Sequence, residues 1–345
     1  MVNSGITVVV GANLQDFGPA GILLIFISRG RCPRFMARPQ ANNVTLDFQI
    51  QGGANLINIP FSLSLLNRKS YRSGRVYSVD YVEYIGTASD VITTACLPFS
   101  YPLFAAYKLG FHNWLEQRAE SIDETGIEPG KWSDFKPYYN IAHLNGTLPQ
   151  RYPQGMDAAF ALADLDRTNA EWNMAEIVRN DHAAATTTTI SVGMLGDDDL
   201  AAATPYGSLM DAYGSTRVAT LAPDPLLPTD ASGSWITRTG EQSGEMSERV
   251  INLIEDENDF PPYANQNDVT LPPTYVGNGQ SAPGGIMMDT SVTGTTGRAV
   301  SLNGGLVPLG LMVVTMGGGA GGILRVHCTR GDYKGVASVS MGDFS

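Results

Sequence analysis

The chain has 345 residues, of which 43% are hydrophobic and 16% are charged, a composition that excludes a disordered protein and indicates a globular one with a full core. Its 38 glycines and 20 prolines favour many short strands joined by turns over a helical bundle. The net charge of −12, taken alone, argues against a nucleic-acid partner.

The charge is unevenly distributed along the chain. Residues 1–75 contain eight cations and two acids, a net charge of +6, so the remaining residues carry −12 − 6 = −18. This asymmetry suggests two faces with different partners, and chance unevenness in a long chain is the alternative. The eight cations are Arg29, Arg31, Arg34, Arg38, Arg68, Lys69, Arg72 and Arg75.

Residues 1–43 are predicted to form a partly basic N-terminal arm. The apolar run Ala20–Ile27 is too short to cross a bilayer and is interpreted as a buried strand. The arginines at 29–38 follow it in a segment where Pro33 and Pro39 prevent regular structure. Arginines in an irregular segment can follow a flexible polyanion, so all four are candidate nucleic-acid-binding residues.

A second basic cluster lies within Asn67–Val79, where four cations occur within eight residues. Guanidinium groups bind phosphate oxygens bidentately, and a tyrosine ring among them can stack on a base. The cluster is therefore a second candidate nucleic-acid-binding segment, with a solvated turn as the alternative. Gly74 predicts a turn, and a strand is predicted to start at Arg75. The cluster comprises Arg68, Lys69, Arg72 and Arg75 around Tyr71.

Hydrophobic periodicity predicts many strands and two helices. The first helix, Leu103–Ala119, has Pro102 near its first turn. Gly110 costs it about 1 kcal/mol relative to alanine, so this helix needs packing to persist. The second helix is predicted at Glu245–Asp256, and 196–206 and 214–244 are predicted to be long surface loops. Strands are predicted at Val44–Gln51, Arg75–Ile85, Asp90–Leu97, Lys131–Leu144, Ala170–Arg179, Thr186–Leu195, Gly285–Val292, Arg298–Leu302, Leu306–Met316, Ile323–Thr329 and Val336–Ser340.

Strands at both ends of the sequence, with helices in long middle insertions, favour an antiparallel sandwich or barrel over an α/β fold. The glycines Gly317, Gly319 and Gly322 spell GxGxxG after a strand. The dinucleotide-binding fingerprint needs a helix next, but the following residues predict another strand. The glycines are therefore interpreted as a hairpin tip.

No catalytic constellation stands out, so the chain is not predicted to be an enzyme. The histidines His112, His143, His182 and His327 are scattered, and three cysteines without CxxC spacing indicate neither a disulfide framework nor a zinc site. Cys96 and Cys328 lie in apolar runs and are interpreted as small core residues. The acidic run Asp197, Asp198 and Asp199 offers hard oxygens to Ca²⁺, particularly at a subunit contact, with a solvated loop as the alternative.

Several short motifs resemble, in the same order, segments of capsid proteins predicted for small circular single-stranded DNA viruses and virus-like genetic elements from marine samples. The Asn67–Val79 stretch is similar to their Asn-Arg-[Arg/Lys]-x-aromatic-Arg-x-Gly pattern, which leads into a strand. The similarities cover most of residues 44–345. The other motifs are KLGFHNW at 108–114, DFKPY at 134–138, ENDFPPY at 257–263 and YKG at 333–335.

The resemblance implies a single jelly roll, an antiparallel eight-stranded β-sandwich, over residues 44–345, with long insertions at about 103–130 and 196–284. It implies a virion protein that self-assembles into a small icosahedral shell around a circular single-stranded DNA genome. Neither a membrane nor a cofactor is implied, apart from Ca²⁺ bridging subunits, and the host receptor is not identified. Many such proteins open with a dense basic arm, whereas this arm is short and diluted by an apolar run.

Two other classes of function remain open. A glycan- or receptor-binding module, such as a spike or a lectin, would have the same strands and acidic loops but would be a monomer or a small oligomer. A secreted hydrolase on the same scaffold would need two carboxylates about 5–10 Å apart in a cleft.

Overall fold

The computed structural model divides the chain into two units, Met1–Gln40 and Ala41–Ser345, and every residue described below belongs to the second. The arm arginines, Cys32, the run Ala20–Ile27 and the predicted helix Glu245–Asp256 lie outside the described residues. None of the described helices is both long enough and apolar enough to span a membrane. The structure describes residues 42–86, 91–126, 130, 132–156, 162–164, 172–181, 186–215, 235–238, 285–292, 299–317 and 321–344.

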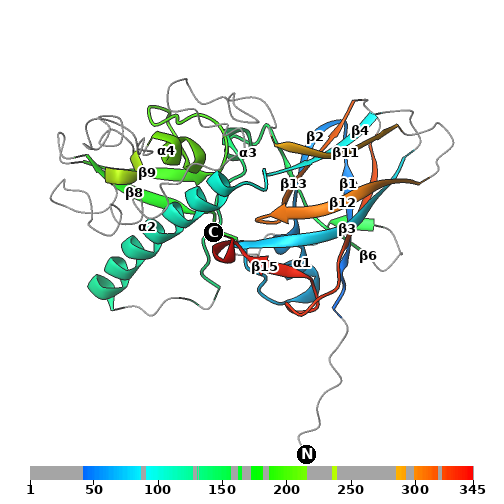
Figure 1. Ribbon diagram of the computed structural model, residues 1–345, viewed down its shortest axis with the longest axis horizontal. Coiled ribbons are helices and arrows are strands. Elements are labelled where there is room, and N and C mark those ends of the chain that lie inside the picture. Colours follow the sequence, from blue (N-terminus) through cyan, green and yellow to red (C-terminus); the bar gives the residue numbers. More distant parts are fainter. Residues whose placement is uncertain are drawn as a thin grey trace, which may run out of the picture. The chain divides into compact units, whose positions relative to one another are not determined.

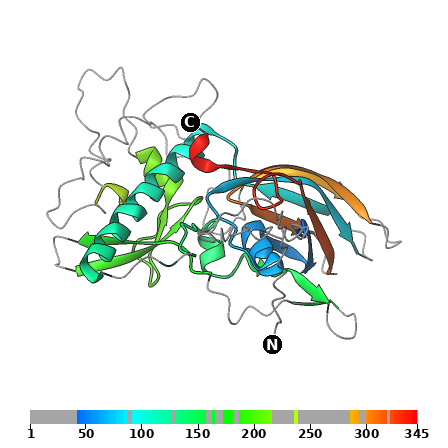
Figure 2. The same ribbon diagram turned by 90° about the horizontal axis from the view of Figure 1, so that it is seen from below.

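Two sheets, antiparallel except where β5 joins, lie face to face (Figures 1 and 2). Their strands are β1 (Thr45–Ile50), β2 (Gly53–Asn58), β3 (Arg75–Ile85), β4 (Val91–Cys96), β5 (Gln150–Arg151), β11 (Ile286–Val292), β12 (Val300–Pro308), β13 (Leu311–Met316), β14 (Gly322–Cys328) and β15 (Ser338–Ser340). The first sheet has the order β1-β14-β3-β12, and β15 also pairs with β3. The second has the order β11-β4-β13-β2-β5.

The space between the sheets is an apolar core. The alternation of β1 buries Leu46, Phe48 and Ile50 on one face, where they meet Met312 and Val314 of the second sheet. Cys96 and Cys328 are also buried in this core, as predicted. The prediction of a mostly antiparallel β-fold with helices in its insertions is thereby confirmed.

The other face of the second sheet is buried as well. Leu56 of β2 and Val313 of β13 are direct partners in register, and both join a second core formed with the segment between β4 and β11. A strand that is buried on both faces shows a continuous apolar run instead of alternation. This explains why β13 reads LMVVTM.

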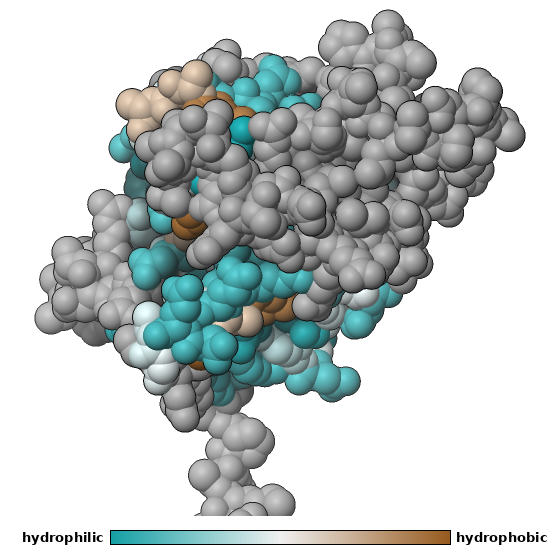
Figure 3. Space-filling model, turned by 90° about the vertical axis from the view of Figure 1, so that its left-hand side faces the viewer, coloured by the Kyte–Doolittle hydropathy of each residue, from teal (hydrophilic) through white to brown (hydrophobic). Residues whose placement is uncertain are grey.

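The described residues of the segment between β4 and β11 form a small sheet of their own, of order β10-β9-β8, and several helical elements. The elements are α2 (Tyr101–Thr125), α3 (Ile141–Leu144), β8 (Glu176–Asp181), β9 (Thr186–Gly193), β10 (Tyr206–Ser208), α4 (Leu209–Ser215) and η1 (Trp235–Arg238), with β6 (Gln154–Met156) and β7 (Leu162–Asp164) as a separate pair. Helix α2 packs against α4 and β8 (Figures 1 and 2). Figure 3 shows the face that lies on the left-hand side of Figure 1. The described surface there is mainly hydrophilic, with small hydrophobic patches.

Helix α2 confirms the first helix prediction and extends it at both ends. It ends at Thr125 because Gly126 adopts a left-handed conformation, with φ of 65°, and its N–H donates to the carbonyl of Ile122. The packing that this helix needs to offset the cost of Gly110 is present. A Cβ at Gly110 would lie 2.5 Å from Cδ2 of the buried Leu209, so glycine lets α4 approach α2 closely.

Two strand predictions and one turn prediction are wrong in detail. Lys131–Leu144 is not a strand: Tyr138 makes one isolated bridge, and Asn140 caps α3 by accepting from the His143 N–H. Leu306–Met316 is divided by a turn at Leu309 and Gly310, which both have positive φ. The glycine-rich connection after β13 is not a hairpin tip, because β13 and β14 belong to different sheets, although a strand follows it as predicted.

Candidate functional site

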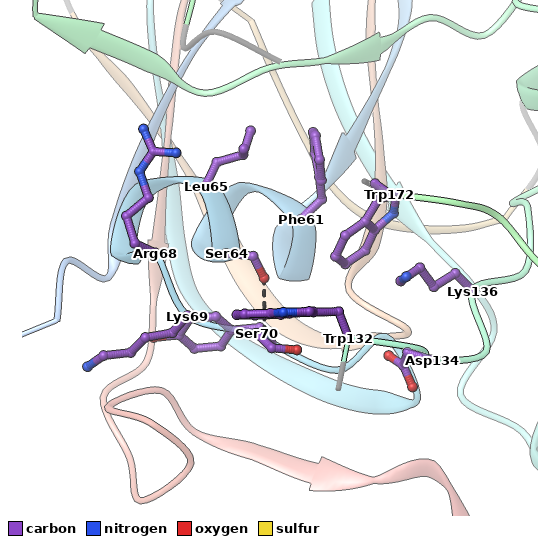
Figure 4. A pocket seen from close by; sticks show the side chains of 11 residues that line it. Phe61, Ser64, Leu65, Arg68, Lys69, Ser70, Trp132, Asp134, Lys136 and Trp172 are labelled. Atoms are coloured by element: carbon purple, nitrogen blue, oxygen red, sulfur yellow. Dashed lines mark hydrogen bonds between the residues drawn. The ribbon is translucent and has the colours of Figure 1, made fainter. Parts of the chain in front are cut away.

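A pocket with a cavity volume of about 360 Å³ lies beside α1 (Ile59–Asn67) (Figure 4). Its walls come from α1, from the turn that follows α1, and from two stretches of the segment between β4 and β11. We call it the basic-aromatic pocket because its side chains are mainly cations and aromatic rings. The lining residues are Phe61, Ser64, Leu65, Arg68, Lys69, Ser70, Tyr71, Trp132, Asp134, Lys136 and Trp172.

Helix α1 supplies one wall and fixes the start of the basic cluster. Its N-terminus is set by Asn58, whose side chain accepts from the Phe61 N–H, and by Pro60 in the first turn. Residues three and four apart share a helix face, which brings Phe61, Ser64 and Leu65 to the pocket. Arg68 ends the helix in a left-handed conformation.

Tyr71 is a fixed part of the pocket wall. Its N–H donates to Ser64 Oγ at 2.9 Å, and its hydroxyl donates to the Lys334 carbonyl at 2.9 Å. The residue is buried, and this burial raises the pKa of its hydroxyl. The ring is therefore held in place before any ligand arrives.

The four cations predicted from the basic cluster divide into two pairs. Arg68 and Lys69 line the pocket, and Lys69 Nζ also donates to the Asn42 side chain. Arg72 instead donates to the Ser133 carbonyl at 2.9 Å. Arg75 donates to the side chain and the carbonyl of Ser338 and lies 3.9 Å from the centroid of the Tyr333 ring.

Asp134 and Lys136, two residues of the DFKPY motif, bring buried opposite charges to the pocket, although the sequence did not predict a binding role for them. The Lys136 ammonium lies 4.6 Å from the centroid of the Trp172 ring, and burial lowers its pKa. Asp134 accepts from the Ser73 N–H at 2.7 Å. Burial raises the pKa of Asp134, and this effect outweighs the Ser73 N–H and the nearby cations, which lower it.

Two tryptophans complete the pocket. Trp132 is 54% exposed, so one indole is open to solvent. The Trp172 ring packs against Phe61 with a centroid separation of 5.1 Å. Within the described ranges, Trp172 Nε1 is buried and has no hydrogen-bond partner. The aromatic run around 132–138 was visible in the sequence, but only the fold brings it to α1.

The pocket can hold an anion that carries a flat ring. Arg68, Lys69 and Lys136 supply three positive charges against the single carboxylate of Asp134, whose oxygens already accept from the protein. Cations bind phosphate oxygens, and indole rings stack on bases.

The acidic run lies elsewhere, at the small sheet. Asp198 Oδ1 accepts from the Ser208 N–H at 2.6 Å and from Trp235 Nε1 at 3.2 Å, while the Asp199 backbone pairs with Tyr206. Among the residues that the structure describes, no three histidine, cysteine, aspartate or glutamate side chains are grouped to hold a metal ion. A Ca²⁺ site at Asp197, Asp198 and Asp199 remains a prediction.

Asp198 is expected to make stability depend on pH. Burial raises its pKa to about 7, and the nearby Asp211 charge adds to the rise. The stabilisation from the protonated carboxyl is complete below the unfolded pKa of about 3.9 and is lost as the pH rises through about 7. We therefore expect Asp198→Asn to raise the melting temperature relative to the wild type more at pH 8 than at pH 5.

The comparison with the wild type is needed because His143 acts in the opposite direction. Burial lowers the pKa of His143 to about 4, so its stabilisation is complete above about 6.5 and is lost as the pH falls through 4. This contribution is common to both proteins and cancels in the difference. An equal melting-temperature difference at the two pH values would contradict the prediction.

Comparison of the chain with models of protein families, with curated proteins and with solved structures gave no match.

Proposed function

We propose that the chain is a viral capsid protein with a jelly-roll fold, and that its copies assemble into a small icosahedral shell around a circular single-stranded DNA genome. The observation that carries the proposal is the strand order. When the two short strands β5 and β15 are left aside, the strands of the two sheets are numbered one to eight along the chain as β1, β2, β3, β4, β11, β12, β13 and β14. The sheet orders then become 1-8-3-6 and 5-4-7-2.

In this order the first strand lies beside the last, the second beside the seventh, the third beside the sixth and the fourth beside the fifth. All four pairs are antiparallel. Such nested pairing arises when one long antiparallel ribbon is folded over on itself, which is the arrangement of a two-sheet jelly roll. Jelly rolls occur in capsid proteins, lectins and cupins, so the fold supports the proposal without deciding the function.

The edge of the second sheet supports assembly. Strand β11 is its terminal strand, and the residues Met287 and Val292 are 61% and 68% exposed. An exposed apolar edge strand promotes pairing with another chain, and monomeric proteins usually protect such a strand with charged residues, prolines, bulges or a covering element. In a shell, contact with a neighbouring copy would cover this edge.

The attachment point of the arm supports a DNA-facing surface. The described chain begins at Asn42, which accepts from Lys69, and Asn43 and Asn67 exchange two hydrogen bonds of 2.9 Å. The described chain therefore begins beside Lys69, a cation of the basic-aromatic pocket.

The proposal is tested by light scattering and electron microscopy on the purified protein, at neutral pH, with and without Ca²⁺ and single-stranded DNA. We expect uniform closed particles. The variant Met287→Asp/Val292→Asp is expected to stay folded and to form no shells, because a buried contact would leave its carboxylates unpaired. The control Val178→Asp changes an exposed valine of β8 and is expected to assemble.

A stable monomer or trimer under every condition would contradict the shell. The glycan- or receptor-binding module would then be the better proposal, and a glycan screen would follow.

A further inference from the structure

We infer that the basic-aromatic pocket binds one unstacked nucleotide of a single-stranded nucleic acid. The base would lie against the indole rings of Trp132 and Trp172, and its phosphate would contact Arg68 and Lys69. The inference rests on the proposed function for the source of the strand, which is the packaged DNA. It goes further by assigning one pocket, with named residues, to one nucleotide.

The pocket has two chemically different ends (Figure 4). Arg68 and Lys69 lie at one end, and Trp172, Lys136 and Asp134 lie at the other. The Asp134 carboxylate repels a phosphate, so the phosphate belongs at the end formed by Arg68 and Lys69. The base then belongs at the aromatic end.

The aromatic end also carries a cation. The Lys136 ammonium lies 4.6 Å from the centroid of the Trp172 ring. An ammonium is a hydrogen-bond donor, and nucleobases carry carbonyl oxygens and ring nitrogens on their edges that accept. A base at this end can therefore lie against an indole ring and accept from Lys136.

The size and surface of the pocket fit this ligand. A volume of about 360 Å³ is near the lower end of the range for small-molecule sites, which suits one nucleotide better than a longer ligand. The exposed indole of Trp132 provides a free stacking face. A neutral sugar could also lie on an indole, but it would leave Arg68 and Lys69 without a counter-charge.

The test uses the full chain with Arg29, Arg31, Arg34 and Arg38 changed to glutamine, so that the arm does not dominate binding. The probe is a fluorescein-labelled five-residue oligodeoxythymidine, and its affinity is measured by fluorescence anisotropy at several salt concentrations. Trp132→Ala and Trp172→Ala are each expected to weaken binding about tenfold, because stacking on one aromatic ring is worth about that factor. Trp132→Phe is expected to restore most of the lost affinity.

The charge variants have a different signature. For single strands each phosphate contact contributes about 0.7 to the slope of log affinity against log salt. Arg68→Ala/Lys69→Ala is therefore expected to reduce that slope by about 1.4, whereas the tryptophan variants leave it unchanged. Arg118→Ala on α2, which removes a cation outside the pocket lining, is the matched control and should change neither quantity.

An affinity of Trp132→Ala for the probe equal to that of the parent chain would overturn the inference. Because Trp132 is exposed, its replacement is not expected to unfold the chain, so a loss of affinity reports on binding. A labelled heparin tetrasaccharide is the competing probe. If it binds more tightly than the oligodeoxythymidine and the tryptophan variants weaken its binding, the pocket binds a sulfated glycan and the inference is wrong. If the protein forms shells that package DNA but the tryptophan variants bind the probe normally, the inference is wrong and the proposed function stands. Pocket-dependent binding by a protein that never forms shells would contradict the proposed function alone.

Discussion

Shells formed by the variant with glutamate at positions 29, 31, 34 and 38 are expected to contain no packaged DNA. Each substitution changes the charge by −2, so the net charge of residues 1–75 falls from +6 to 6 − 8 = −2. Four lost phosphate contacts also remove about 2.8 from the salt slope of single-strand binding. Loss of attraction combined with new repulsion makes this the largest functional effect that we expect.

The measurement is the amount of nuclease-protected DNA per shell, together with the ratio of ultraviolet absorbance at 260 and 280 nm. The matched control replaces the same four arginines by lysine, which keeps the charge, and it should package normally. Thermal unfolding of each variant reports separately on folding. Shells of the glutamate variant that hold a normal amount of DNA would show that the arm does not bind the genome.

The strands with one buried face were predictable from the sequence, and the strand buried on both faces was not. In β1 the alternation of buried and half-buried residues gives a clear period of two. In β13 both faces are covered, so Leu311–Met316 has no period of two. The apolar residues from Leu306 at the end of β12 continue into it and hide the turn at Leu309 and Gly310. Only Gly310 marked the position of that turn.

Helix α1 could have been predicted from its own sequence. Asn58 before Pro60 is a strong start signal, because asparagine caps N-termini and proline suits the first turn. The strand β2 directly before it was also missed. It is largely buried and lacks alternation, so it carries the same weak signal as β13.

The pocket itself could not be predicted, because its residues are distant in the sequence. The basic cluster marked Arg68 and Lys69, but Trp132, Lys136 and Trp172 come from the segment between β4 and β11. Sequence distance also hid the partners of the other two cations. Arg72 meets an acceptor 61 residues away, and Arg75 meets one 263 residues away.

The second large effect concerns stability: Asp134→Ala is expected to lower the free energy of unfolding by about 3 kcal/mol. The side chain of Asp134 is only 10% exposed, and it accepts from the Ser73 N–H. Its removal leaves the Ser73 N–H without its acceptor and the buried Lys136 ammonium without a nearby negative charge. Arg72 adds little, because its side chain is 51% exposed and the contact with Asp134 is 3.4 Å, so Arg72→Ala should cost less than about 1 kcal/mol.

Urea unfolding, followed in the Met287→Asp/Val292→Asp background that prevents assembly, measures these changes as shifts of the midpoint. Burial disfavours the charged form of both Asp134 and Lys136, so the pair itself is only weakly stabilising. The double variant Asp134→Ala/Lys136→Met should therefore recover about half of the loss, because it removes the stranded ammonium but leaves the Ser73 N–H unpaired. A double variant less stable than Asp134→Ala would mean that Lys136 stabilises the pocket wall through Trp172 and not through the carboxylate.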